Sequence, residues 1–158
     1  MAPLTRIRMV VYLQSVDLFA YCSAEQMVRI AGIAHQERFA RGECIYSAND
    51  PAEALYCVVS GEVALERSGG DQRRVGRNGT FGVEEILSDR LRGEDARAEA
   101  DTSVLAIEAD DFFDLLSNNI EIVKTLFRQL LCQPRRRQRA ETADEAEESA
   151  PPRRLVAG

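Results

Sequence analysis

Side chains that could bind a metal or act as a nucleophile are few and far apart in this sequence of 158 residues. The four cysteines are Cys22, Cys44, Cys57 and Cys132, with no C-x-x-C pair, and His35 is the one histidine. Structural zinc sites need four closely spaced soft ligands, and covalent catalysis needs a nucleophile beside a base. We therefore expect free thiols in a reducing compartment, His35 at the surface or at a strand start, no cofactor and no enzymatic activity.

The charge of the chain argues against a nucleic-acid partner. The formal net charge is −6 and the isoelectric point is about 4.9. Residues 133–158 hold six arginines and five acids, so residues 1–132 hold 14 basic and 21 acidic side chains. Affinity for phosphate backbones comes from clustered Lys and Arg. An acidic body must therefore bind any anion through a local arrangement of groups.

Neither a membrane span nor a secretion signal is evident. Apolar runs such as residues 9–13 are far shorter than the roughly 20 residues of a membrane helix. The N-terminus has no apolar segment of the kind that signal peptides carry. We expect a cytoplasmic protein.

Helical patterns occupy the first 35 residues. Apolar residues between Leu4 and Val16 recur at spacings of three and four, which predicts a short helix. Ser23 followed by Gln26 is a capping-box pattern, and the helix that it opens has Met27 and Ile30 on one face. We assign residues 1–35 to N-terminal helices.

Residues 36–108 have the pattern of many short strands. Runs rich in β-branched and aromatic residues, such as 43–46, 55–59, 62–66 and 102–107, alternate with Gly, Asn, Asp and Pro. Gly42 and Gly61 fall between strands, where tight turns need a positive φ. The fold class is therefore mainly β with flanking helices, an antiparallel β-roll of the jelly-roll (double-stranded β-helix) type.

The helical period returns over residues 109–133, which we assign to C-terminal helices. Phe112, Leu115 and Leu116 form one apolar stripe, and residues 120–131 carry a longer one. Pro134 should end the second helix. Residues 134–158 form a charge-mixed tail with almost no apolar residues, which predicts disorder.

The order of these elements and several short motifs resemble a cyclic-nucleotide-binding domain, the sensor module of catabolite-activator-type regulators and kinase A regulatory subunits. The resemblance covers Leu13 to Leu131 and begins with SVDLF at 15–19. Residues 39–45 read FARGECI, similar to F-x-x-G-E-x-I, and residues 55–63 read LYCVVSGEV, close to L-Y-x-I-x-x-G-x-V. The Phe81-Gly82 pair then opens a segment, 81–97, that resembles the phosphate-binding cassette of this family.

The resemblance implies a ligand site in that cassette. Family members place a glutamate after Phe-Gly for the ribose 2′-hydroxyl, and an arginine further on for the cyclic phosphate. A short helix between the two offers its N-terminal amides to the same phosphate, so the resemblance places the arginine near the start of that helix. Counting back from the strand at 102–107 puts Arg92 on the arginine position. The ribose position falls on Val83, or on Glu84 if the segment shifts by one residue. The implied ligand-binding residues are Phe81, Gly82, Val83, Glu84, Arg92 and Gly93.

The cassette also departs from the family pattern. Gly93 replaces a hydroxyl residue and Glu94 replaces an alanine, with Asp95 beside it. We expect Glu94 and Asp95 to compete with a phosphate for Arg92. In the alternative interpretation, Arg92 is a surface arginine that pairs with Glu94 or Asp89.

The resemblance gives the C-terminal helix the role of capping the pocket and coupling it to a partner, through Val123, Leu126, Phe127 and Leu130. Alternatively, the stripe of Ile120, Val123, Phe127 and Leu130 packs on the β-roll. In the coupling case, the edge formed by Leu126 and Leu131 would contact a partner protein or a second copy.

Two functions stay open at this point. In the first, the chain is a non-enzymatic regulatory module that senses a small anionic nucleotide, cAMP or cGMP, through a weakened pocket. In the second, it is a protein-interaction module that kept the fold and lost the ligand. A DNA-binding function would need a helix-turn-helix after Leu131, and we find no such pattern there.

Overall fold

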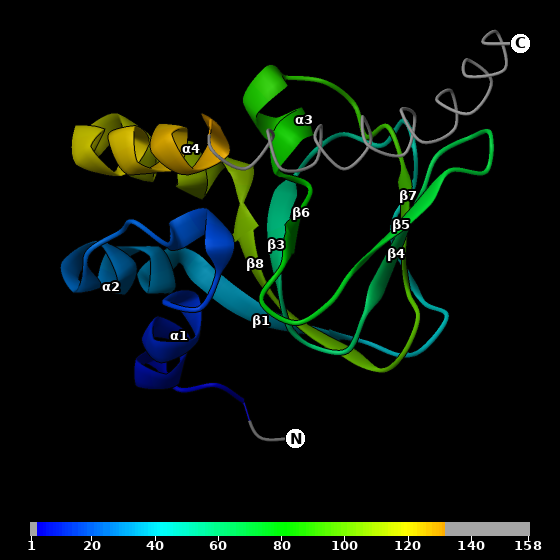
Figure 1. The fold of residues 1–158 in the computed structure, drawn as a ribbon, viewed down its shortest axis with the longest axis horizontal. Coiled ribbons are helices and arrows are strands. Elements are labelled where there is room, and N and C mark those ends of the chain that lie inside the picture. Colours follow the sequence, from blue (N-terminus) through cyan, green and yellow to red (C-terminus); the bar gives the residue numbers. More distant parts are fainter. Residues whose placement is uncertain (1–2, 132–158) are drawn as a thin grey trace, which may run out of the picture.

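The computed structural model describes residues 3–131. The expected end of the last helix at Pro134, the charged tail and Cys132 lie outside these residues. In Figure 1, helices from both ends of the described chain lie on one side of a β-sheet, and a second sheet lies on its other side.

The two α-helices of the N-terminal part are short and capped by side chains. Thr5 accepts a hydrogen bond from the backbone of Arg8 at the start of the first helix, and Ser23 and Gln26 form the predicted capping box at the second. The elements are α1 (Arg6–Leu13), the 3-10 helix η1 (Asp17–Phe19) and α2 (Ala24–Ile33).

Eight strands follow in two antiparallel four-stranded sheets, which confirms the predicted β-roll. They are β1 (Ala34–Phe39), β2 (Cys44–Tyr46), β3 (Ala54–Ser60), β4 (Val63–Glu66), β5 (Gln72–Val75), β6 (Thr80–Phe81), β7 (Asp95–Ala98) and β8 (Thr102–Glu108). One sheet has the order β1-β8-β3-β6 and the other β2-β7-β4-β5. The first strand begins at Ala34, two residues before the expected start of the β-roll, and includes His35 with a half-exposed side chain.

The central strands of the first sheet are buried on both faces. In β8, Val104 packs in the core between the sheets, whereas Leu105 and Ile107 pack against the helices. In β3, Val58 and Cys57 divide in the same way. Because successive side chains of a strand point to opposite faces, every second residue serves one core, and both strands therefore have apolar residues at adjacent positions.

Two helices follow the β-roll, as expected. They are α4 (Ala109–Asn118) and a helix over residues 120–131, separated at Asn119. The expected buried stripe of the second helix was wrong in part. Leu126 is buried in the core beside Ile122, whereas Ile120 and Phe127 are more than 60% exposed. Leu126 therefore cannot form the exposed edge that we predicted with Leu131.

Candidate functional site

A left-handed glycine fixes the start of the helix in the cassette. Gly82 has φ 82° and precedes α3 (Val83–Ser88). A Cβ atom on Gly82 would lie 2.9 Å from Nη1 of Arg92 and 3.2 Å from the carbonyl oxygen of Ala54. Only glycine therefore suits this position, both for its backbone and for the approach of the arginine.

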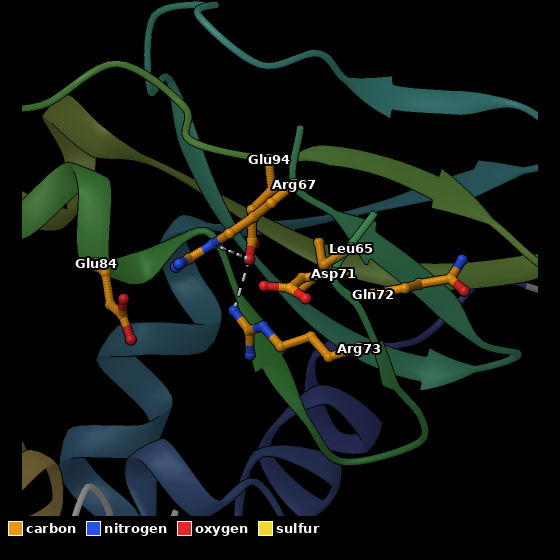
Figure 2. A pocket seen from close by; sticks show the side chains of 7 residues that line it. All are labelled: Leu65, Arg67, Asp71, Gln72, Arg73, Glu84 and Glu94. Carbon is orange, nitrogen blue, oxygen red and sulfur yellow. Dashed lines mark hydrogen bonds and ion pairs between the residues drawn. The ribbon is translucent and has the colours of Figure 1, made fainter. Parts of the chain in front are cut away.

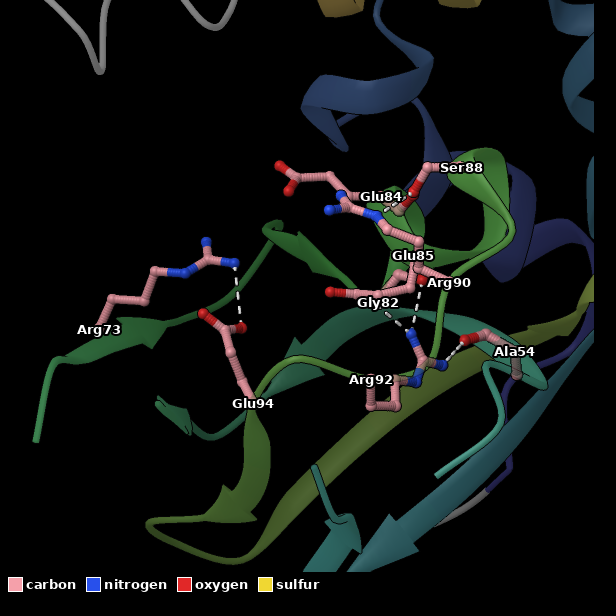
Figure 3. Close-up of polar contacts among 9 residues, drawn as sticks. All are labelled: Ala54, Arg73, Gly82, Glu84, Glu85, Ser88, Arg90, Arg92 and Glu94. Atoms are coloured by element: carbon pink, nitrogen blue, oxygen red, sulfur yellow. Dashed lines mark hydrogen bonds and ion pairs between the residues drawn. The ribbon is translucent and has the colours of Figure 1, made fainter. Parts of the chain in front are cut away.

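Arg92 is buried, which overturns the alternative of a surface arginine. The residue is 2% exposed. Its Nη1 donates to the Gly82 carbonyl at 2.8 Å and to Oε1 of Glu85 at 3.2 Å, and its Nη2 donates to the Ala54 carbonyl. Figure 3 shows the guanidinium against the start of α3 and Ala54. The backbone of Arg92 is held as well, because its N–H donates to Asp50 and its carbonyl accepts from Asn49.

An aromatic cluster supports the guanidinium from the core. The Cζ atom of Arg92 lies 4.1 Å from the centre of the Tyr46 ring, a cation–π geometry. Phe81 stacks on Tyr56 with ring centres 5.1 Å apart, because the two residues are paired between β3 and β6. Burial raises the pKa of the Tyr46 phenol, and the positive charge of Arg92 opposes that rise in part.

Glu94 does not compete for Arg92, contrary to the prediction. Its carboxylate lies 3.2 Å from Nε of Arg67 and 3.4 Å from Nη2 of Arg73, on the β4–β5 hairpin. Asp95 accepts a hydrogen bond from the backbone of Ala48 instead. The carboxylate that pairs with Arg92 is that of Glu85, in the first turn of α3, a residue that we did not select from the sequence.

A pocket of about 480 Å³ opens beside this arrangement, between the hairpin and α3. Figure 2 shows Glu94 reaching between Arg67 and Arg73, with Glu84 on the opposite side. The lining residues are Leu65, Arg67, Asp71, Gln72, Arg73, Glu84 and Glu94. Three of these are acids and two are arginines, so the wall carries no excess of positive charge for a phosphate.

The predicted site residues are split between the pocket and the core. Glu84 lines the pocket. If the ribose position falls on Glu84 rather than on Val83, a carboxylate is therefore present at that position in the pocket. Val83 is buried in the core cluster of the helices. Gly93 is exposed, and within residues 3–131 no atom outside its chain neighbours lies within 4 Å of a Cβ built on it. Arg92 is buried and, in the described part of the chain, is not one of the residues that line the pocket.

The C-terminal helix contacts the N-terminal elements. The Sγ atom of Cys22 lies 3.5 Å from Oγ1 of Thr125, and Arg128 stacks on Tyr21 at 5.8 Å. Among the expected capping residues, Leu126 and Leu130 pack in or against the helical core, and Phe127 is 61% exposed. None of the described residues of this helix lines the pocket in this conformation.

Comparison with known proteins identifies the family. A sequence profile described as "Cyclic nucleotide-binding domain" matches residues 36–119, more than half of the chain. The chain belongs to the cyclic nucleotide-binding domain family, as its motifs and its two sheets indicate.

Proteins of several kinds are similar to this chain in sequence or in fold. The cAMP-dependent protein kinase regulatory subunit of Emericella nidulans is 28% identical over 107 residues, which are 66% of this chain and 26% of that protein. The N-terminal domain of a transcriptional regulator from Streptomyces coelicolor superimposes with a TM-score of 0.68 at 27% identity, over 82% of this chain and 96% of that one. The regulatory subunit of a cAMP-independent protein kinase A from Trypanosoma cruzi, bound to guanosine, has a TM-score of 0.66 at 18% identity, over 75% of this chain and 43% of that one.

The matched region is small compared with the curated relatives. The chain spans 28% and 26% of the length of the two curated proteins that it matches. None of the helices in residues 3–131 has the length and apolar character to cross a membrane.

Proposed function

We propose that this domain is a non-enzymatic regulatory module that binds a cyclic nucleotide weakly in the pocket between α3 and the β4–β5 hairpin. The observation that carries this proposal is the placement of Arg92. It is the tenth residue after Gly82, and its guanidinium lies at the start of α3, as the family resemblance requires of the phosphate-binding arginine. The neighbouring pocket has room for a nucleotide, and Glu84 lines it as a partner for ribose hydroxyls.

Two features make the binding weak. Arg92 already has an anionic partner in Glu85, at 3.2 Å. The pocket wall adds the carboxylates of Asp71, Glu84 and Glu94, and like charges raise the free energy of a bound phosphate. We therefore expect dissociation constants for cAMP and cGMP well above the values of a site whose arginine is unpaired.

A thermal-shift titration of the purified chain with cAMP and cGMP, up to millimolar concentration, tests this function. A ligand at 100 times its dissociation constant stabilises the native state by about 2.7 kcal/mol, which raises Tm by several degrees in a domain of this size. A saturable rise with either nucleotide supports the proposal. No rise at millimolar concentration contradicts it.

A second candidate is an interaction module without a ligand, in which the C-terminal helix pairs with a second copy of the chain. The helix exposes Ile120, Phe127 and Leu131, which are 63%, 61% and 72% exposed and recur after seven and four residues. That spacing is typical of a helix–helix seam, and a second copy supplies the same seam. Light scattering would show a dimer that Phe127→Glu converts to a monomer. Val28→Glu, at a half-exposed position of α2, is the control.

A further inference from the structure

Glu85 and Arg92 form a buried ion pair at the phosphate-binding arginine. Their side chains are 17% and 1% exposed, and Oε1 of Glu85 lies 3.2 Å from Nη1 of Arg92. Within residues 3–131, Glu85 supplies the one carboxylate at ion-pairing distance from this guanidinium. The other partners of Arg92 are the neutral carbonyls of Gly82 and Ala54. The positive charge of Arg92 is therefore balanced by a single anion, and that anion belongs to the chain itself.

The pair is held in place from both sides. Glu85 is the third residue of α3, whose start is fixed by the left-handed Gly82. Arg92 is fixed through its backbone by Asp50 and through its ring contact with Tyr46. Both residues are thus anchored by contacts other than the one between them, so the ion pair forms with little further loss of conformational entropy.

One donor of the Arg92 guanidinium is not used in the free domain. Its Nε atom is buried and makes no hydrogen bond within the described residues. The guanidinium is already out of water in the free domain, so a phosphate that replaces the Glu85 carboxylate would pay little additional desolvation there and would find an unused donor in this N–H. With its side chain 1% exposed, however, a phosphate reaches it only when neighbouring groups move.

We propose that the Glu85 carboxylate is an internal anion that takes the place of the ligand phosphate at Arg92 and thereby sets the ligand selectivity of the pocket. The inference rests on the proposed function and deepens it. A cyclic phosphate must displace the Glu85 carboxylate to reach Arg92, whereas a ligand without a phosphate meets no such competition. Glu85 is thus a specificity-determining residue, because it weakens the binding of cyclic nucleotides more than the binding of the corresponding nucleosides.

The test compares two ligands that share a base and a ribose and differ in the phosphate. Isothermal titration of the full chain with cAMP and with adenosine is repeated on Glu85→Ala and Glu85→Gln. Asp89→Asn is the control, since it removes the same charge from the end of the same helix. Asparagine suits the left-handed backbone at that position, where φ is 54°. Thermal melts confirm that each variant is folded, and Glu85→Gln keeps the side-chain volume if Glu85→Ala does not fold.

We expect the affinity for cAMP to rise at least tenfold in Glu85→Ala and by a smaller factor in Glu85→Gln. The affinity for adenosine should change less than twofold, and Asp89→Asn should bind both ligands with the wild-type affinities. An unchanged or weakened cAMP affinity in both folded Glu85 variants overturns the inference. Equal gains for cAMP and adenosine overturn it as well.

The same titration separates this inference from the proposed function. If the wild type binds no cAMP but Glu85→Ala does, the proposed function fails and the role of Glu85 holds. If the wild type and Glu85→Ala bind cAMP with the same affinity, the function holds and the role of Glu85 fails.

Discussion

The ion pair between Glu85 and Arg92 should stabilise the fold measurably even without a ligand. Two unit charges about 4 Å apart interact by about 4 kcal/mol at an effective dielectric constant of 20. Glu85 is 17% exposed, so solvent screens part of this energy. We expect a coupling energy of about 2 to 3 kcal/mol between the two side chains, within the range measured for residues in direct contact.

A double-mutant cycle measures this coupling. The free energies of unfolding by urea are compared for the wild type, Glu85→Ala, Arg92→Met and the double variant. Each single variant should lose about 3 kcal/mol, because it leaves one buried charge without its partner. Arg92→Met also leaves the carbonyls of Gly82 and Ala54 without a donor. The double variant should be more stable than the sum of the two losses predicts.

The pair of Arg74 and Glu62 provides a matched control. It has a similar separation, 3.4 Å, but its side chains are 60% and 42% exposed. Exposed pairs of this kind contribute about 0 to 1 kcal/mol. A coupling for Glu85 and Arg92 that is no larger than that of this surface pair would refute the buried geometry on which the account depends.

Three further predictions follow from the backbone and from buried groups. Gly61→Ala should destabilise the fold far more than Gly42→Ala, because a Cβ on Gly61 would lie 2.6 Å from a backbone oxygen, whereas the described residues leave the space within 4 Å of a Cβ on Gly42 open. Urea unfolding of the two variants measures the difference. Burial raises the pKa of the Tyr46 phenol, so its contribution to stability is present below the unfolded pKa, about 10, and is lost as pH rises above it. Tyr46→Phe should therefore flatten the decline in unfolding free energy above pH 10 by up to about 1.4 kcal/mol per pH unit, and an unchanged slope would argue against burial of the phenol. At pH 8, a maleimide should modify exposed Cys44 rapidly in the native state and Cys57 only after unfolding, because burial raises the pKa of the Cys57 thiol to about 12. Mass spectrometry of the labelled peptides measures this order, and labelling of Cys57 before Cys44 would contradict the prediction.

Local signals in the sequence were sufficient to predict much of the fold. The capping box at Ser23 and Gln26 forms as predicted, since it depends on residues one helical turn apart. Gly42 and Gly61 have φ of 86° and 93°, as turns between strands require. These features are encoded within a few residues, and therefore a single sequence reveals them.

The buried face of the C-terminal helix could not be predicted in this way. Apolar residues between 120 and 131 surround much of the helix, so two different stripes have helical spacing. The helix buries Ile122 and Leu126, against a core that also includes residues from α1 and α2. The choice between the stripes depends on the surface that the helix packs against, which periodicity does not describe.

The partner of Arg92 was missed for a related reason. Glu94 is close to Arg92 in the sequence, but it reaches the β4–β5 hairpin. Glu85 is seven residues away and meets Arg92 because the chain turns back after α3 and brings the guanidinium to the start of that helix. One signal was present in the sequence: an acid at the third position of a helix lies over the N-terminus of that helix, where the resemblance also placed the arginine.

The NMR signals of the arginine side chains report most directly on the central claim. This claim is that the Glu85 carboxylate pairs with the Arg92 guanidinium in the free domain, and that a cyclic phosphate must replace this carboxylate to bind there. NMR spectra of the chain with ¹⁵N-labelled arginine side chains, recorded before and after addition of cAMP, would follow this exchange. We predict separately resolved, slowly rotating Nη–H signals for Arg92 in the free protein, and a shift of these signals on saturation with cAMP while those of exposed Arg74 stay unchanged. Averaged Arg92 signals in the free protein, or a cAMP response confined to Arg67 and Arg73, would contradict the account.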